Sequence, residues 1–337
     1  EETEQSQLLE DIRRQVLLEA SRQPEGPTGR ALATVISLST DMQFQIALEE
    51  AIRERVAITD WLEQAGGLDG AAKQLSSMLG IGASDTIEAI EAAIVDGPHL
   101  PCSEWEAVAK TCDTGSKNDQ AHARRLREAV QSAGTARLDA YLSVFLTDAG
   151  GPRKQLLTAG LAKSEPDLAR SFNDEGVRVG VLCEKRRAAI ARDRTMALLT
   201  LASEVLGRYA AEKTRRSLLD YDDLISHTRH MLDRVDSSWV HYKLDLGIDH
   251  LLIDEAQDTS PAQWDIIKKF VSEFTAGAGA RGGLWRSIFA VGDDKQSIFS
   301  FQDAAPEAFA EMRQFFKLAH DAAGLPFQPI PFQYSFR

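Results

Sequence analysis

The stretch that decides the fold is His250-Leu251-Leu252-Ile253-Asp254-Glu255-Ala256-Gln257-Asp258, a short apolar run that ends directly in carboxylates. A second run of the same kind, Ser287-Ile288-Phe289-Ala290-Val291, leads into Gly292-Asp293-Asp294. Short apolar runs bounded by turn-forming residues are typical of buried strands. The two runs therefore predict two strands, each of which ends in acidic residues.

Between these runs the sequence predicts a helix. Ser260-Pro261 offers an N-cap followed by proline at the first helical position. Apolar side chains then recur along one helical face, at Trp264, Ile267, Phe270, Val271 and Phe274. Strand, helix and strand form a βαβ unit, which builds a parallel sheet whose ligands bind beyond the carboxyl ends of its strands. We therefore expect an α/β fold with its chemistry at the acidic strand ends.

Residues 1–216 have a different texture, rich in Ala, Leu, Glu, Arg and Gln, with apolar residues three and four apart. Breaks fall at Gly66-Gly67 and at Gly150-Gly151-Pro152, among other places. No internal repeat is visible, which favours an irregular helical domain over a solenoid. The predicted organisation is a helical part at residues 1–216 followed by an α/β part at residues 217–337.

Composition sets broad limits on the class of protein. The chain has 337 residues, of which 43% are hydrophobic and 26% charged, and it holds no apolar run near the length of a membrane span. The start, Glu1-Glu2-Thr3-Glu4, has neither a methionine nor a signal-peptide pattern. Cys102, Cys112 and Cys183 show no metal-binding spacing. We expect a cytoplasmic chain with no membrane partner that begins in mid-protein and has reduced, structural thiols.

The formal net charge of −13 argues at first sight against a nucleic-acid partner. The charge is unevenly distributed, because residues 1–100 hold 7 Lys or Arg against 18 Asp or Glu, and residues 151–200 hold 10 against 6. Two basic runs are candidates for phosphate contacts, although each is more typical of a solvated helix face: Arg124, Arg125 and Arg127, and Lys185, Arg186 and Arg187. Charge alone decides nothing.

Asp254 and Glu255 form the first candidate site. In a nucleotide-hydrolysing site, adjacent carboxylates at a strand end divide the work, since one positions Mg²⁺ and the next polarises the attacking water. The alternative is a solvated acidic loop that caps the helix beginning near Ser260.

The second candidate site is the segment from Gly292 to Gln302. Gly292 allows a sharp exit from the strand. Gln296 has an uncharged carboxamide that can contact a phosphate or an attacking water in either polarity. Phe299 and Phe301 are aromatic residues on a polar loop, where a nucleic-acid base could stack. For the two phenylalanines, a place in the core is the competing interpretation.

These motifs carry a resemblance to a known family. Residues 254–259 resemble the Walker B motif of the UvrD, Rep and RecB group of superfamily 1 DNA helicases, and residues 291–299 resemble the motif that follows it. Residues 217–225 resemble the segment that re-enters the motor domain, and residues 334–337 resemble the start of an arginine motif. Residues 260–264, 294–302 and 306–309 are similar to the AddA-type subunits of bacterial helicase-nucleases.

The resemblance implies roles in the binding and hydrolysis of ATP. Asp254 would hold Mg²⁺, and Glu255, beside the same ion, would activate the hydrolytic water. Gln296 would sense the γ-phosphate and couple it to DNA, and Arg337, after a candidate strand at Ile330–Gln333, would stabilise charge developing on that phosphate.

It also implies contacts with nucleic acid. Gln257 would link the nucleotide site to the DNA site, and Phe299 and Phe301, followed by Gln302, would lie against the bases of the translocating strand. Many relatives carry tyrosine and tryptophan in place of the two phenylalanines, and arginine and glycine in place of Gln302 and Asp303. Asp303 adds a negative charge close to where the DNA would pass, which opposes contact with phosphates.

In fold, the resemblance implies a partial P-loop NTPase (RecA-like) motor domain with a large inserted all-helical subdomain. Residues 1–216 would be the 1B-like insertion and residues 217–337 the C-terminal part of the 1A-like motor domain. No GxxxxGK[ST] loop occurs in the sequence, so we expect this chain alone to be inactive as an ATPase.

The function that the resemblance implies is that of a fragment of an ATP-dependent 3′-to-5′ DNA helicase. The parent protein would be the AddA-like part of a helicase-nuclease that uses ATP and Mg²⁺ and repairs double-strand breaks by homologous recombination. It would act on DNA together with an AddB-like partner subunit.

Three other interpretations stay open. One is a catalytically inactive helicase-like module that binds DNA or a partner. A second is a helicase of the UvrD or RecB type without the AddA context. The last is a metal-dependent nuclease that uses Asp254, Glu255 and Asp258, with Lys295 recruited as a cation.

Overall fold

The computed structural model describes residues 2–82, 84–233, 248–275, 286–293 and 306–331. The chain divides into two compact units, Glu1–Ala210 and Ala211–Arg337. Within the described ranges, no helix combines the length and the apolar character needed to cross a membrane.

The described elements of the first unit are all helices, as its composition predicts, and they are joined by loops that include one isolated antiparallel bridge between Leu146 and Pro152. Its helices are α1 (Glu2–Arg22), α2 (Pro27–Leu38), α3 (Asp41–Arg53), α4 (Arg55–Ala65), α5 (Leu68–Met78), α6 (Ile87–Val95), the short 3₁₀ helix η1 (Cys102–Glu104), α7 (Trp105–Asp113), α8 (Lys117–Gln131), α9 (Gly134–Phe145), α10 (Ala159–Ser164) and α11 (Pro166–Arg216). The predicted break at Gly66-Gly67 lies between α4 and α5, where both glycines have positive φ angles.

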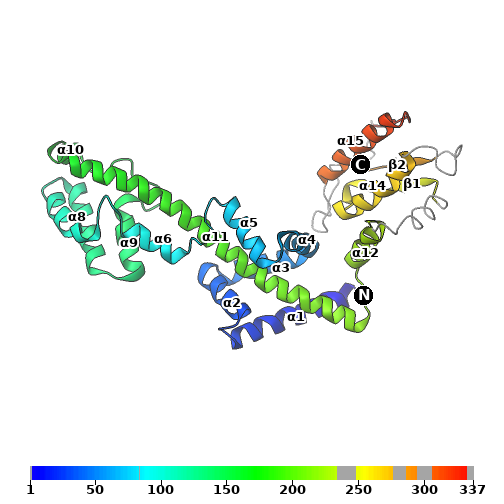
Figure 1. The fold of residues 1–337 in the computed structure, drawn as a ribbon, viewed down its shortest axis with the longest axis horizontal. Coiled ribbons are helices and arrows are strands. Elements are labelled where there is room, and N and C mark those ends of the chain that lie inside the picture. Colours follow the sequence, from blue (N-terminus) through cyan, green and yellow to red (C-terminus); the bar gives the residue numbers. More distant parts are fainter. Residues whose placement is uncertain (1, 83, 234–247, 276–285, 294–305, 332–337) are drawn as a thin grey trace, which may run out of the picture. The chain divides into compact units, whose positions relative to one another are not determined.

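Helix α11 runs through the first unit and packs against both of its hydrophobic cores (Figure 1). It has 51 residues and, at about 1.5 Å per residue, is about 75 Å long. Its first half contributes Phe172 and Val179 to one hydrophobic core, and its second half contributes Leu201 and Val205 to another. The two cores therefore share one helix, which explains how an irregular set of short helices is held together.

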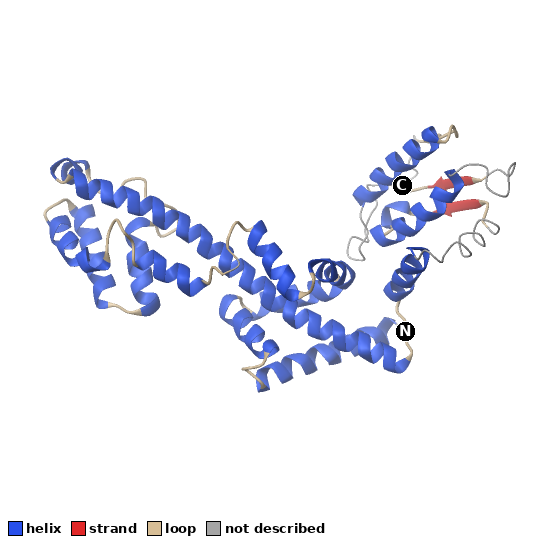
Figure 2. Ribbon diagram, viewed as in Figure 1, coloured by secondary structure: helices blue, strands red, loops and turns tan. Residues whose placement is uncertain are grey.

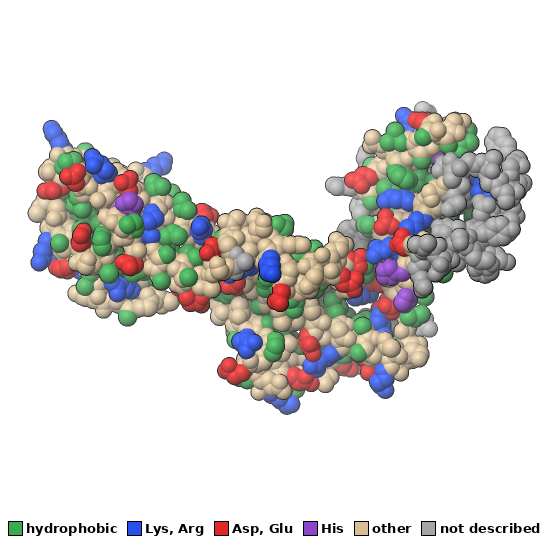
Figure 3. Space-filling view, in the orientation of Figure 1, with side chains coloured by type: hydrophobic (Ala, Val, Ile, Leu, Met, Phe, Trp, Pro, Cys, Tyr) green, Lys and Arg blue, Asp and Glu red, His purple; other side chains and the backbone are tan. Residues whose placement is uncertain are grey.

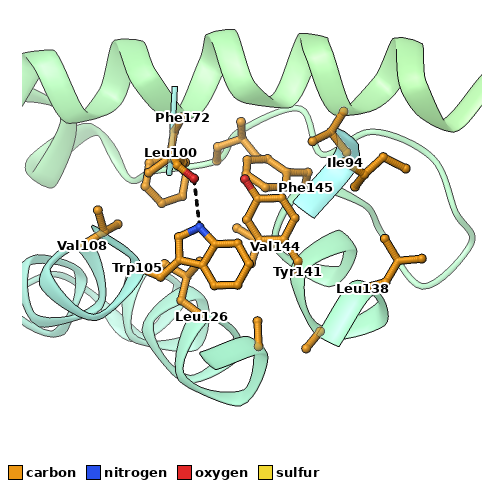
Figure 4. Packing of buried hydrophobic residues seen from close by; sticks show 14 of the residues in the cluster. Ile94, Leu100, Trp105, Val108, Leu126, Leu138, Tyr141, Val144, Phe145 and Phe172 are labelled. Atoms are coloured by element: carbon orange, nitrogen blue, oxygen red, sulfur yellow. Dashed lines mark hydrogen bonds between the residues drawn. The ribbon is translucent and has the colours of Figure 1, made fainter. Parts of the chain in front are cut away.

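The larger core is built around aromatic side chains (Figure 4). The rings of Trp105 and Tyr141 stack with their centroids 4.5 Å apart, and Phe145 packs edge-on against Tyr141 at 5.2 Å. The indole Nε1 of Trp105 donates a 2.9 Å hydrogen bond to the carbonyl of Leu100, so this fully buried ring leaves no polar atom without a partner.

A buried ion pair lies beside this core. Glu175 has a fully buried side chain, whose Oε1 accepts a 2.6 Å hydrogen bond from the Tyr141 hydroxyl and whose Oε2 accepts one of 2.8 Å from Arg178 Nε. The guanidinium also donates to the carbonyls of Ala93 and Ile94 at 2.6 and 2.8 Å. Arg178 therefore ties the last turn of α6 to α11, and the buried carboxylate is neutralised and hydrogen-bonded.

His122 on α8 is buried among positive charges. Burial is the largest cause that lowers its pKa from 6.5 to about 4, and Arg125 and Arg153 lower it further. Asp119 opposes these effects. The Nδ1 atom of His122 has no hydrogen-bond partner in the described part of the chain. The imidazole is therefore neutral in the folded protein at neutral pH.

The depressed pKa of His122 predicts that acid destabilises the first unit. Between pH 6.5 and 4 the unfolded chain binds a proton that the folded chain does not, so stability that is present above pH 6.5 is lost as pH falls. Between pH 7 and pH 4.5 the loss attributable to this group is about 2 kcal/mol. Urea unfolding at pH 7 and pH 4.5 measures it. His122→Gln should show a smaller difference between the two pH values than the wild type, and His99→Gln, at an exposed position, should match the wild type.

The second unit contains the small sheet. Its described elements are α12 (Tyr221–Asp233), β1 (His250–Ile253), the 3₁₀ helix η3 (Ala256–Asp258), α14 (Pro261–Thr275), β2 (Ser287–Ala290) and α15 (Pro306–Ala322). Strands β1 and β2 pair in parallel, with Leu251 opposite Ile288 and Ile253 opposite Ala290. The predicted βαβ unit is therefore confirmed.

The start of α14 also agrees with the prediction from sequence. The backbone N–H of Gln263 donates to Ser260 Oγ at 3.3 Å, and the backbone N–H of Ser260 donates to Gln263 Oε1 at 2.9 Å. This reciprocal pair is a capping box. Trp264 and Val271, on the predicted apolar face, are fully buried.

The two faces of the sheet differ. Leu251, Ile253, Ile288 and Ala290 belong to a core with residues of α14 and α15, including Trp264, Val271, Met312 and Phe316. Leu252 and Phe289, which oppose each other in the register, are 73% and 52% exposed. Parallel sheets are normally covered on both faces. In the described residues this sheet is covered on one.

The observed fold is mostly helical with a small parallel sheet, in agreement with an α/β class for the second part (Figure 2). The division between units falls inside α11, at Ala210 and Ala211. The strand expected at Ile330–Gln333 is not formed at Ile330 and Pro331, and Gln333 lies outside the described residues.

Candidate functional site

The candidate site lies where β1 and β2 end. Because the strands are parallel, their carboxyl ends meet at one edge of the sheet. The backbone N–H of Val291 donates to the carbonyl of Ile253, and the backbone N–H of Ala256 donates to the carbonyl of Val291, both at 2.9 Å. The acidic residues that follow each strand are therefore brought together, as the sequence predicts.

Asp254 and Glu255 both have exposed side chains at this edge. Asp254 Oδ1 accepts a 3.0 Å hydrogen bond from the backbone N–H of Glu255. Glu255 has a left-handed backbone conformation, with φ 47° and ψ 49°, which is uncommon for a residue with a side chain. Such conformations cluster at functional sites because the surrounding structure must hold them.

Gln257 is the buried centre of the site, with 1% of its surface exposed. Its Nε2 donates to Glu255 Oε2 at 2.8 Å and to Asp258 Oδ2 at 3.3 Å, and its Oε1 accepts from the backbone N–H of Asp293 at 2.9 Å. The Gln257 carboxamide is buried and hydrogen-bonded at both ends, and the contact with nucleic acid expected of Gln257 stays a prediction from the sequence. What the side chain joins is the two strand ends.

Gly292 packs against Gln257. A Cβ at this position would lie 2.7 Å from Gln257 Oε1 and 3.1 Å from Phe309 Cε1. The sequence analysis expects Gly292 to allow a sharp exit from the strand, and Gly292 is not among the described glycines with positive φ. The reason for glycine here is the close approach of the Gln257 side chain.

Gly292→Ala should therefore push the Gln257 carboxamide away from the amide of Asp293. We expect a loss of about 1–3 kcal/mol in the free energy of unfolding, from overpacking and a disturbed buried hydrogen bond. Urea denaturation followed by circular dichroism measures it. Gly207→Ala is the control, because nothing lies within 4 Å of a Cβ there, and this change inside α11 should stabilise the chain. Equal effects of the two substitutions would contradict the packing described for Gly292.

A cavity of about 690 Å³ lies beside β2. Its lining is largely apolar and includes Ile288, Ala290, Phe309, Met312, Phe316 and Phe327. Asp254 and Glu255 do not line it. The carboxylates therefore face a different part of the surface from this apolar cavity.

The described residues contain no group of three or more His, Cys, Asp or Glu side chains placed to hold a metal ion. Asp254 and Glu255 supply carboxylate oxygens from two adjacent residues. Mg²⁺ is commonly bound by one or two carboxylates together with water and substrate phosphates. The oxygen donors at the strand end fit that ion, whereas the sequence contains no GxxxxGK[ST] loop to cradle the phosphates.

Five predicted site residues lie outside the described residues, namely Gln296, Phe299, Phe301, Gln302 and Arg337. Their roles remain predictions from the sequence.

Three of the six basic residues considered for phosphate contacts are engaged in ion pairs. Arg127 pairs with Asp113 and Glu106, Arg186 with Glu91, and Arg187 with Glu184. Figure 3 shows positive and negative side chains interspersed over the face of the first unit that it draws. These pairs are typical of a solvated helix surface.

The segment predicted to re-enter the motor domain contains an ion-pair network that sequence reasoning missed. Asp220 and Asp223 cap the start of α12 reciprocally, each accepting from the other's backbone N–H at 2.9 Å. Lys213 Nζ lies 2.8 Å from Asp220 Oδ2 and 2.6 Å from Asp223 Oδ2. Burial is the largest single influence on the pKa of Lys213 and lowers it, but the two carboxylates together outweigh burial and raise that pKa. The three-residue spacing of Asp220 and Asp223 is typical of a capping box, and it is the feature of the sequence that could have predicted this helix start.

Comparison with known proteins shows which proteins this chain is similar to. Residues 160–317 match the family model of the UvrD/REP helicase N-terminal domain. The chain is 35% identical over 104 residues to the ATP-dependent DNA helicase SRS2 of Saccharomyces cerevisiae, which is 31% of this chain and 8% of that protein. It is 38% identical over 101 residues to an ATP-dependent helicase/nuclease subunit of Latilactobacillus sakei. That match covers 30% of this chain and 10% of the relative. It is 36% identical over 111 residues to the ATP-dependent DNA helicase Rep of Salmonella typhimurium, which is 33% of this chain and 14% of that protein.

The predicted resemblance to UvrD/Rep-type helicases and to AddA-type helicase/nuclease subunits is therefore confirmed. The matched segments cover between 8% and 14% of the length of these three relatives.

Proposed function

We propose that this chain is part of an ATP-dependent DNA helicase in which the carboxyl ends of β1 and β2 form half of the nucleotide site. The observation that carries the proposal is the parallel pairing that joins Asp254-Glu255 to Gly292-Asp293, in a segment that matches the UvrD/REP helicase N-terminal domain. Three relatives of the chain are named as ATP-dependent helicases or helicase/nuclease subunits.

In this function the two carboxylates have different roles. Asp254, directly at the end of β1, would hold Mg²⁺, which supplies positive charge next to the nucleotide phosphates when bound. Glu255 would accept the proton of the attacking water. Its carboxylate is exposed at the strand end and is held by a hydrogen bond from Gln257, so it is both accessible and oriented.

The open face of the sheet supports the idea that the motor domain is completed by further chain. A two-stranded sheet is marginally stable by itself. Leu252 and Phe289 are a pair of apolar side chains for which the described residues provide no cover. A segment of the complete protein that carries a GxxxxGK[ST] loop would add the missing cover and the phosphate cradle together.

The finer assignment is to an AddA-like parent. We place residues 1–216 as a 1B-like helical insertion and residues 217–337 as the C-terminal part of a 1A-like motor domain. The helicase/nuclease relative from Latilactobacillus sakei supports an AddA-like protein. Such a parent would translocate 3′ to 5′ on DNA, work with an AddB-like partner in the cytoplasm and take part in double-strand break repair.

Glu255→Gln tests the proposal in the complete protein encoded by the reading frame that contains this chain. We expect the DNA-stimulated kcat for ATP to fall by about 10²- to 10⁴-fold, because a carboxamide cannot accept the proton of water, while the KM for ATP stays close to the wild type. Asp265→Asn, at a surface ion pair with Lys268 on α14, is the control and should leave kcat unchanged. The 337-residue chain by itself should not hydrolyse ATP. Full activity of Glu255→Gln, or turnover by the short chain, would contradict the proposal.

A second candidate is a catalytically inactive module that uses the helicase fold to bind DNA or another protein chain. This candidate predicts that the complete reading frame encodes no GxxxxGK[ST] loop. The nucleotide sequence upstream of the Glu1 codon separates the two candidates. A strand followed by that loop supports the helicase, and a start codon with no such loop supports the binding module.

A further inference from the structure

We propose that Gln257 is a positioning residue that aims the Glu255 carboxylate and makes its orientation depend on the backbone that follows β2. This inference rests on the proposed function, since Glu255 is the residue assigned to activate water.

The hydrogen bonds of Gln257 allow one orientation of its carboxamide. The amino group faces the carboxylates of Glu255 and Asp258, and the carbonyl oxygen faces the backbone N–H of Asp293. With the amide reversed, an oxygen would face two carboxylates and an amino group would face an N–H donor. Bonds to a carboxylate are the stronger kind, so the side chain is locked by charge as well as by burial.

Glu255 needs such a support. Its carboxylate is exposed and its backbone has positive φ, so neither packing nor a regular element determines where the side chain points. The backbone is held by the bond from Asp258 N–H to the carbonyl of Glu255, at 2.8 Å, and by the bond from Ala256 N–H to Val291. Of the side-chain hydrogen bonds described at this strand end, the one from Gln257 Nε2 is the bond that reaches the Glu255 carboxylate.

The other end of Gln257 is attached to the exit of β2. Its Oε1 accepts from Asp293 N–H, and Gly292 packs so closely on it that a Cβ would not fit. A shift of residues 292–293 therefore moves the Gln257 carboxamide, which in turn moves the Glu255 carboxylate. If Gln257 served only to pack the interior, another side chain of the same size could replace it without any effect on the Glu255 carboxylate.

Gln257→Met in the complete protein separates these roles, because methionine has a similar length and makes none of the three hydrogen bonds. We expect kcat for ATP to fall by about ten- to a hundredfold with the KM for ATP within about twofold of the wild type, from the lost bond to a charged group. Gln263→Met is the matched control, since it removes a carboxamide from the exposed capping box of α14 and should leave kcat unchanged. Wild-type kcat in Gln257→Met would overturn the proposal.

Amide exchange on the 337-residue chain tests the bridge without any need for ATP hydrolysis. In Gln257→Met the amide of Asp293 should exchange at least about tenfold faster than in the wild type, because its hydrogen bond is lost, while the amides of α11 keep their rates and report an intact fold. An unchanged rate at Asp293 would overturn the proposal. If the complete protein lacks ATPase activity while exchange responds as expected, the proposed function fails and the bridge between the strand ends stands.

Discussion

The parallel pairing of β1 with β2 is the constraint on which the candidate site depends. Parallel strands require a crossover, which α14 provides, and they place both carboxyl ends at one edge of the sheet. Asp254 and Asp293 are 39 positions apart in the chain but lie at the same strand edge, around one buried glutamine. An antiparallel pair would have put these acidic residues at opposite ends. The parallel direction of the two strands therefore brings these residues together, and the residue types then decide what chemistry the site can perform.

The helical unit solves a different physical problem. Its short helices cannot each bury a full apolar face alone, and the long helix α11 gives two separate cores a common wall. Along that wall a buried carboxylate, Glu175, is tolerated because Tyr141 and Arg178 satisfy it and Arg178 continues to the carbonyls at the end of α6. The same charge without these partners would oppose folding strongly. Such networks depend on residues that are far apart in sequence.

At the strand ends, polar groups are satisfied in a way that leaves the chemistry exposed. Gln257 is buried, and its carboxamide is hydrogen-bonded through both its nitrogen and its oxygen. Asp254 and Glu255 remain accessible to solvent. This division leaves both carboxylates accessible to solvent while a hydrogen bond from Gln257 holds the Glu255 side chain in place. The positive φ of Glu255 belongs to the same arrangement, since a strained backbone is tolerated where several bonds hold it.

The sequence by itself determined the local features, because these depend on neighbours along the chain. The apolar runs predicted β1 and β2, Ser260-Pro261 predicted the start of α14, and the Asp254 to Asp258 motif predicted a helicase resemblance that the comparisons confirm. What only the tertiary structure decided are contacts between distant segments. The burial of Gln257, its bond to Asp293 and the close packing that requires glycine at 292 depend on how two strands meet in space, and no local pattern encodes that meeting.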